Sequence, residues 1–146
     1  MRPRPLVPDD FDVPATLEHD RFRLRKLTVD DVVKDLEAIH ARVAPGGAPD
    51  PWSETTLRAN LVDLGWHEKE FELRRSFAYT VVRPDESQVI GCVYLYPSDE
   101  ADADVWLWVR QEAWDEGLDP VLEAEVRRWV AESWPFESVA WRERER

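Results

Sequence analysis

The chain is poor in cysteine, glycine and positive charge. Its single cysteine, Cys92, excludes a disulfide within the chain, and nothing indicates an oxidising compartment. Lysine and arginine number 19 against 31 aspartates and glutamates, so the net charge is -12. Because affinity for nucleic acid depends on neutralising phosphates, we expect no nucleic-acid partner. The negative electrostatic field of the chain attracts small cationic amines. It opposes an anionic ligand unless local hydrogen-bond donors bind that ligand.

Long hydrophobic runs are also missing. No stretch approaches the roughly 18 to 20 apolar residues that a membrane span requires, and the amino terminus has no apolar signal core. We therefore expect a cytoplasmic protein without a membrane partner. The three histidines have no partners at metal-ligand spacing, so we predict no metal site. The 146 residues, 43% of them hydrophobic, suffice for one globular domain.

Prolines and charges divide the chain into three parts. Four prolines within 1–20 favour an extended arm lying on the domain. We predict a single domain at 21–142, followed by a charged end at 143–146. Alternation and turn residues predict strands at 21–27, 76–82, 88–96, 104–110 and 137–142. The run 88–96 is apolar on both faces, which indicates a central strand and buries Cys92 as an unreactive thiol.

Helical periodicity predicts three helices. The first follows Thr28 and ends before Pro45, and the third covers 120–133. Ser53 is the predicted cap of the second helix, in which Gly65 predicts a bend or a division into two pieces. The following residues of that helix share its predicted inner side: Leu57, Leu61, Leu64, Glu68 and Phe71. Helices and strands in this order indicate a mixed α/β fold with no internal repeat.

Three stretches resemble the GNAT superfamily of acyl-CoA-dependent N-acetyltransferases. They are FRLRKLTVDDVVKDLEAI, FAYTVVRPDESQVIGCVYLYP and ADVWLWVRQEAWDEGLDPVLEAEVRRWV, and together they span roughly residues 21 to 131. The resemblance implies a mostly antiparallel central sheet flanked by helices and splayed between the family's fourth and fifth strands. It also implies acetyl-CoA as co-substrate and acetyl transfer to a small amine.

The resemblance assigns the cofactor to the strand 104–110 and the loop after it. The backbone of Trp108, Val109 and Arg110 would hold the pantetheine arm. The pyrophosphate would lie on loop amides and the next helix terminus, in a pattern of Arg or Gln, two residues, Gly, any residue, then Gly or Ala. On this chain those positions are Trp114, Gly117, Leu118 and Asp119, so one of the three defining positions is kept.

The replacement at Asp119 leaves two interpretations open. Asp119 followed by Pro120 is typical of a helix cap, whose carboxylate would occupy the amides that a pyrophosphate needs. In one interpretation the cofactor still binds, with Arg110, Arg127 or Arg128 supplying positive charge. In the other, the domain is catalytically inactive and binds a ligand or a protein in the same cleft. Trp114 lies in the turn, where we expect it to be exposed.

Two residues are candidates for the general base. Asp104 opens the strand whose face carries Trp106 and Trp108, so it is a candidate base or an ordinary exposed acid. His67 lies on the second helix and is a candidate base or a packed histidine.

The family's late helix, which commonly carries a tyrosine general acid, has no room after 142. The general acid would then come from the hairpin tyrosines, of which we select Tyr94, or from water. Without the family's last strands, the 137–142 strand would have an unpaired edge, which we expect the arm or a second copy of the chain to cover.

Overall fold

The computed structural model describes residues 5–42, 52 and 54–142. The strands are β1 (Thr16–Glu18), β2 (Arg23–Lys26), β3 (Phe77–Val82), β4 (Val89–Tyr96), β5 (Ala103–Val109) and β6 (Val139–Trp141). The helices are η1 (Val29–Asp31, a short 3-10 helix), α1 (Val32–His40), α2 (Leu57–Glu72), α3 (Gln111–Asp115) and α4 (Leu118–Ser133).

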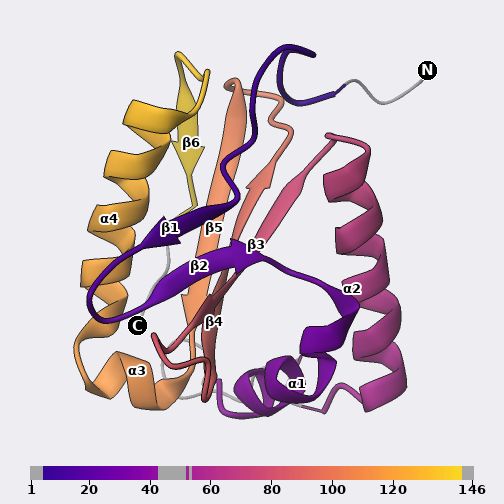
Figure 1. Cartoon of the computed structure of the whole chain (residues 1–146), viewed down its shortest axis with the longest axis vertical. Helices are drawn as coiled ribbons and strands as arrows, with labels where there is room; N and C mark the ends of the chain where they lie inside the picture. The colour runs from indigo at the N-terminus through magenta and orange to yellow at the C-terminus, as the bar shows by residue number, and fades with distance from the viewer. Residues whose placement is uncertain (1–4, 43–51, 53, 143–146) are drawn as a thin grey trace.

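All six strands form one sheet in the order β1-β2-β3-β4-β5-β6, as Figure 1 shows. The pairs from β1 to β5 are antiparallel, whereas β6 runs parallel to β5. This confirms the mixed α/β fold and the central position of 88–96. The arm contributes β1, which was not predicted as a strand, and β1 lies at the edge opposite β6. The prediction that the arm covers the β6 edge is therefore wrong for residues 5–20.

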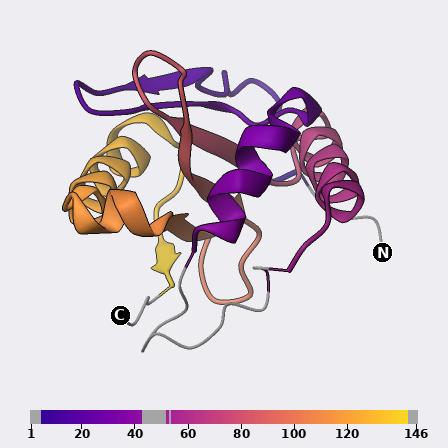
Figure 2. The ribbon, with the colours of Figure 1, turned by 90° about the horizontal axis from the view of Figure 1, so that it is seen from below.

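Helices cover both faces of the sheet (Figure 2). The α1 and α2 helices lie on one face and α4 lies on the other. Under α4 the core is built from alternate residues of β5, including Val105 and Leu107, with Leu122 and Trp129 of α4. Under α1 and α2 it contains Cys92 and Trp108. Because successive side chains of a strand point to opposite faces, the two cores share strands but not side chains.

The second helix differs from its prediction in its start, its shape and its buried side. Thr56 caps α2 by accepting from the amide of Ala59, whereas Ser53 lies outside the described residues. The helix is continuous through Gly65, so the predicted division into two pieces does not occur. Leu57 and Leu61, predicted to be buried, are 51% and 46% exposed. Leu64 is buried as predicted, and the other buried residues of α2 are Asn60, His67 and Glu70.

The loop after β5 also differs. Gly117 adopts a left-handed conformation (φ 75°), which glycine permits, and α4 begins at Leu118 directly after it. The predicted cap at Asp119 is therefore wrong, because the glycine starts the helix earlier. Asp119 lies in the first turn of α4 and is buried. The residues before the glycine form α3, which was not predicted, and Trp114 is half-buried against the α4 core rather than exposed.

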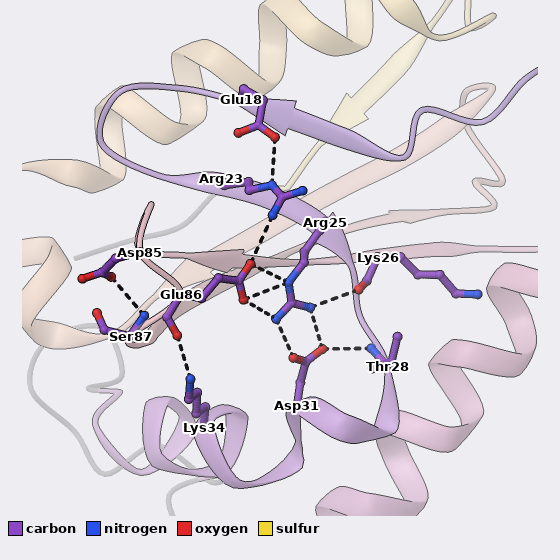
Figure 3. Close-up of polar contacts among 10 residues, drawn as sticks. All are labelled: Glu18, Arg23, Arg25, Lys26, Thr28, Asp31, Lys34, Asp85, Glu86 and Ser87. Atoms are coloured by element: carbon purple, nitrogen blue, oxygen red, sulfur yellow. Dashed lines mark hydrogen bonds and ion pairs between the residues drawn. The ribbon is translucent and has the colours of Figure 1, made fainter.

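An ion-pair network joins β2, η1 and the tip of the β3–β4 hairpin (Figure 3). The Arg25 guanidinium contacts Asp31 with Nη2–Oδ1 and Nη1–Oδ2 distances of 2.8 and 3.1 Å, and its Nε lies 3.0 Å from Oε2 of Glu86. Asp31 also accepts from the backbone amide of Thr28 at 3.0 Å, which fixes the start of η1. Hydrogen bonds from Arg25 lower the pKa of Glu86. The network thereby attaches the hairpin tip to the start of the first helical segment.

Candidate functional site

A cavity of about 220 Å³ lies between the sheet and the helices α1 and α2. Its aromatic lining residues are Trp52, Trp66, His67, Tyr94, Tyr96, Trp106 and Trp108. Its other lining residues are Ile39, Arg42, Thr55, Ala59, Asn60 and Asp63. We call it the aromatic cavity. Because aromatic faces and a carboxylate both attract cations, the lining is suited to an ammonium ligand.

About one helical turn of α2 separates Asp63 from His67, and both side chains line the aromatic cavity. Nε2 of His67 lies 3.4 Å from Oδ2 of Asp63, and the pair has the i, i+4 spacing of one helix face. The His67 ring is buried, and its Nδ1 has no hydrogen-bond partner within the described protein. Its centroid lies 5.3 Å from that of Tyr94. The structure therefore brings together two of the three predicted catalytic residues.

Tyr94 stands in a row of parallel rings on the sheet. Its ring stacks on Trp106 at 5.1 Å and on Tyr96 at 5.5 Å between centroids. The indole N–H of Trp108 donates to the Tyr94 hydroxyl oxygen at 3.0 Å. Burial raises the pKa of Tyr94 well above 10, so the phenol stays protonated at neutral pH. A protonated phenol whose oxygen already accepts a hydrogen bond is suited to donate its own proton.

A buried acid lies behind the cavity wall. Asp35 of α1 is 4% exposed, and its Oδ2 accepts from Nδ2 of Asn60 at 2.9 Å. Burial raises the pKa of Asp35 to about 6, against the opposing effect of that hydrogen bond. Asn60 is itself a lining residue, so Asp35 fixes the orientation of a polar group in the cavity wall.

Asp104, the third predicted catalytic residue, lies outside the aromatic cavity. It faces the α1–α2 side of β5 but lines a separate hollow with Ser98 and Arg142. Its Oδ2 is 3.9 Å from a guanidinium nitrogen of Arg142. The geometry thus separates Asp104 from His67 and Tyr94, and it favours a partly screened surface acid at that position.

The predicted cofactor strand is β5, and β6 accompanies only its first part. The β5–β6 register covers Ala103–Val105, and the Arg142 amide donates to the Val105 carbonyl at 3.1 Å. The strand then continues through Trp108 and Val109, both of which are buried. The end of the β6 register therefore lies beside Trp106, a lining residue of the aromatic cavity.

Positive charge near the loop is already paired. Nη2 of Arg110 lies 2.8 Å from Glu112 and its Nη1 lies 3.4 Å from Glu37. Arg127 contacts Glu123 at 3.4 Å. On the exposed side of α4, Arg128 pairs with Glu125 and Glu132. Each arginine predicted to assist a pyrophosphate therefore has a carboxylate partner within the chain.

The loop amides are also engaged. The amides of Trp114, Glu116 and Gly117 donate to carbonyl oxygens of Arg110, Glu112 and Trp114 at 3.1, 3.0 and 2.9 Å. Glu116 forms two 2.8 Å hydrogen bonds with Arg83, which fix this closed loop to the β3–β4 hairpin. The amides of Trp114, Glu116 and Gly117 are therefore not available to a pyrophosphate, whereas within the described part of the chain no side-chain cap hydrogen bond closes the start of α4. Leu118 and Asp119, the next two residues of the predicted pattern, are buried.

Among the residues that the structure describes, no group of three or more histidines, cysteines, aspartates and glutamates could hold a metal ion. In residues 5–42, 52 and 54–142 no helix is both long enough and apolar enough to span a bilayer.

Sequence reasoning missed part of the cavity wall although a signal was present. Asn60, Asp63 and His67 have the i, i+3, i+7 spacing that places polar side chains on one side of a helix. The apolar residues Leu57 and Leu61 suggested a different inner side. Arg42 carried no comparable signal, because its contact with the Trp108 ring, 4.6 Å to the centroid, depends on how α1 ends against the sheet.

Comparison with solved structures identifies the fold. A ribosomal-protein-S5-alanine acetyltransferase from Vibrio fischeri is 16% identical with a TM-score of 0.60, covering 82% of this chain and 67% of that one. A spermidine N-acetyltransferase chimera from Vibrio cholerae and hSSAT is 12% identical with a TM-score of 0.63, covering 83% and 69%.

The Microcin C7 self-immunity acetyltransferase MccE, in complex with acetyl-CoA and AMP, is 8% identical with a TM-score of 0.63, covering 84% and 69%. No protein-family model and no curated protein matches the sequence. The chain has the fold of the GNAT superfamily, as the sequence predicted.

Proposed function

We propose that this chain is a GNAT-type N-acyltransferase that uses acetyl-CoA to acetylate a small cationic amine bound in the aromatic cavity. The observation that carries the proposal is the position of the cavity, which shares Trp106 with the part of β5 where the β6 register ends. A GNAT fold brings the acetyl thioester to that strand. The proposal places only the thioester end of acetyl-CoA beside the cavity. The amides of Trp114, Glu116 and Gly117 donate within the chain and do not bind its pyrophosphate.

The cavity residues have separate tasks in this proposal. Acetyl-CoA supplies the activated acetyl group when it is bound. The aromatic rings and Asp63 bind the ammonium, and His67 accepts one of its protons on a ring nitrogen, which leaves a neutral amine. Asp63 stabilises the imidazolium that results, since its carboxylate lies 3.4 Å from that ring.

Tyr94 carries out the remaining proton transfers. As the amine nitrogen bonds to the acetyl carbon, the carbon–sulfur bond breaks and its electron pair leaves with sulfur. The Tyr94 hydroxyl gives its proton to that sulfur, and the second amine proton restores the phenol. Burial keeps Tyr94 protonated at neutral pH, so this proton is present when needed.

A coenzyme A release assay tests this proposal. Wild-type protein with acetyl-CoA and a primary amine should release free thiol, and His67→Gln should lower kcat by about a hundredfold, as removal of a general base does. His19→Gln is the matched control, because His19 stacks on Phe22 rather than lining the cavity. Equal loss in both variants, or no turnover by the wild type with any amine, would contradict the proposal.

A second candidate function is a catalytically inactive ligand-binding module. The closed α3–α4 loop favours it, because the amides of Glu116 and Gly117 already donate within the chain. Unfolding with and without acetyl-CoA separates the two. A ligand at 100 times its dissociation constant stabilises a fold by about 2.7 kcal/mol. No stabilisation by acetyl-CoA, together with binding of an amine, would favour the inactive module.

A further inference from the structure

A second cavity of about 490 Å³ adjoins the aromatic cavity. It lies between the second half of α2, the β4–β5 connection and the arm. Its lining residues are Pro5, Leu6, Trp66, Glu70, Arg75, Ser76, Tyr96, Pro97, Ser98, Ala101 and Asp102. Trp66 and Tyr96 line both cavities, so the two hollows meet at these rings.

The junction lies beside the candidate base. The ring of His67 is 5.0 Å from Trp66 and 6.5 Å from Tyr96 between centroids. Trp66 is 45% exposed and stands at the rim of α2 rather than in the core. The two cavities therefore adjoin at Trp66 and Tyr96, close to His67.

The second cavity has a polar but largely neutralised wall. Both carboxylate oxygens of Glu70 contact Arg75, at 2.6 and 2.9 Å, and Lys69 lies 3.1 Å from the same carboxylate. Oδ2 of Asp102 accepts from the amides of Glu137 and Ser138 at 2.8 and 3.2 Å. These charges have partners, so the wall offers hydrogen bonds and apolar contact rather than an unbalanced charge.

We infer that the acceptor is an elongated linear amine, whose reactive amino group occupies the aromatic cavity and whose polar distal end lies in the second cavity. This inference rests on the proposed function and specifies its substrate class. A compact amine would fill the first cavity alone. An elongated one gains by burying its chain between Trp66 and Tyr96, with about a fourfold gain in affinity for each methylene removed from water.

The test uses ethanolamine and its longer linear amino-alcohol homologues as acceptors. For the wild type, kcat/KM should rise with chain length until the second cavity is filled. Ala101→Trp, which fills that cavity, should abolish this rise and lower kcat/KM more for the long acceptors than for ethanolamine. Ala124→Trp is the control, because Ala124 is exposed on α4. Pro97→Trp fills the same cavity from an exposed position and replaces Ala101→Trp if that variant does not fold.

The outcomes separate this inference from the proposed function. A profile that is flat with chain length, or an Ala101→Trp effect that is equal for short and long acceptors, overturns the elongated acceptor while leaving acetyl transfer intact. If no amine is acetylated, calorimetric titration of the same homologues without cofactor decides. Affinity that rises with length and is lost in Ala101→Trp supports the two-cavity site, and equal affinities refute it.

Discussion

The two faces of the sheet have different chemistry. On the α4 face, residues such as Leu122, Val126 and Trp129 form an apolar core. On the face of α1 and α2, the buried residues include Asp35, Asn60 and His67, beside the aromatic cavity. Burying a polar group costs free energy unless it has a hydrogen-bond partner, so polar groups persist where they serve a second purpose. The comparison indicates that the α4 face supplies stability, and the α1–α2 face carries the cavity that we propose as the site.

Removing one tryptophan from each face should give the largest contrast. Trp129 is 4% exposed and its ring lies 5.0 Å from Tyr79, so Trp129→Ala should lower the free energy of unfolding by about 3–5 kcal/mol. Trp106 is only half-buried, and Trp106→Ala should cost less than about 2 kcal/mol while weakening amine binding. Urea unfolding and amine titration of both variants measure this. Equal stability losses would remove the distinction between the faces.

Replacement of Asp35 should reveal a pH-dependent cost in the free energy of folding on the α1–α2 face. Since the pKa of Asp35 rises from 3.8 to about 6 on folding, its ionisation in the folded state costs about 3 kcal/mol. The stability of the wild type relative to Asp35→Asn should therefore be highest below about pH 4 and fall as the pH rises through about 6. Urea unfolding of both proteins at pH 4 to about 7 tests this. A constant difference between them would show that Asp35 does not carry the cost.

The Arg25 network should matter more than a surface pair of the α4 side. Arg25→Met should lower the free energy of unfolding by roughly 2 kcal/mol, because it leaves the buried Asp31 carboxylate without its guanidinium. The loss should diminish as the pH falls below the ordinary pKa of glutamate and through the lowered pKa of Glu86 in the folded protein, because Arg25 lowers that pKa. Arg128→Met, on an exposed surface, should cost less than about 0.5 kcal/mol in the same urea experiment. Similar losses of stability in Arg25→Met and Arg128→Met would show that the network contributes no more than an exposed ion pair.

Substitution of two glycines by alanine should change the free energy of unfolding in opposite directions, and by the smallest amounts. Gly117→Ala forces a side chain into a left-handed conformation and should cost about 1 kcal/mol. Gly65→Ala lies inside α2, where a Cβ would meet Cγ1 of Val29 at an ordinary 3.9 Å, so it should stabilise by about 0.5–1 kcal/mol. Thermal unfolding measures both. Stabilisation by Gly117→Ala would show that the α3–α4 loop does not need its present conformation.

The sequence was sufficient for the β3–β4 hairpin and insufficient for β1 and for the buried side of α2. Apolar runs and a turn predicted the hairpin of β3 and β4 within one residue at each end, because those strands are buried on both faces. The side of α2 was predicted incorrectly because Asn60 and His67 face inward. Their burial depends on Asp35 and Tyr94, which no local pattern reveals.

The same limit applied to the site. His67 and Tyr94 were selected for separate reasons, and only the packing of α2 on β4 places them together. Asp104 was selected from its position on the strand, yet it lies in another hollow beside Arg142. The conformation of the α3–α4 loop could not be predicted. It depends on the left-handed Gly117 and on the ion pair between Glu116 and Arg83, two residues that are distant in sequence.

Calorimetric titration of the aromatic cavity tests the central claim most directly. A primary alkylammonium and the alcohol of equal length should be compared on the wild type and on Asp63→Asn, which keeps the shape of the wall. The wild type should bind the ammonium about tenfold more tightly than the alcohol, and Asp63→Asn should lose most of that preference. Equal affinity of the wild type for both ligands would contradict a cation site on this face of the sheet.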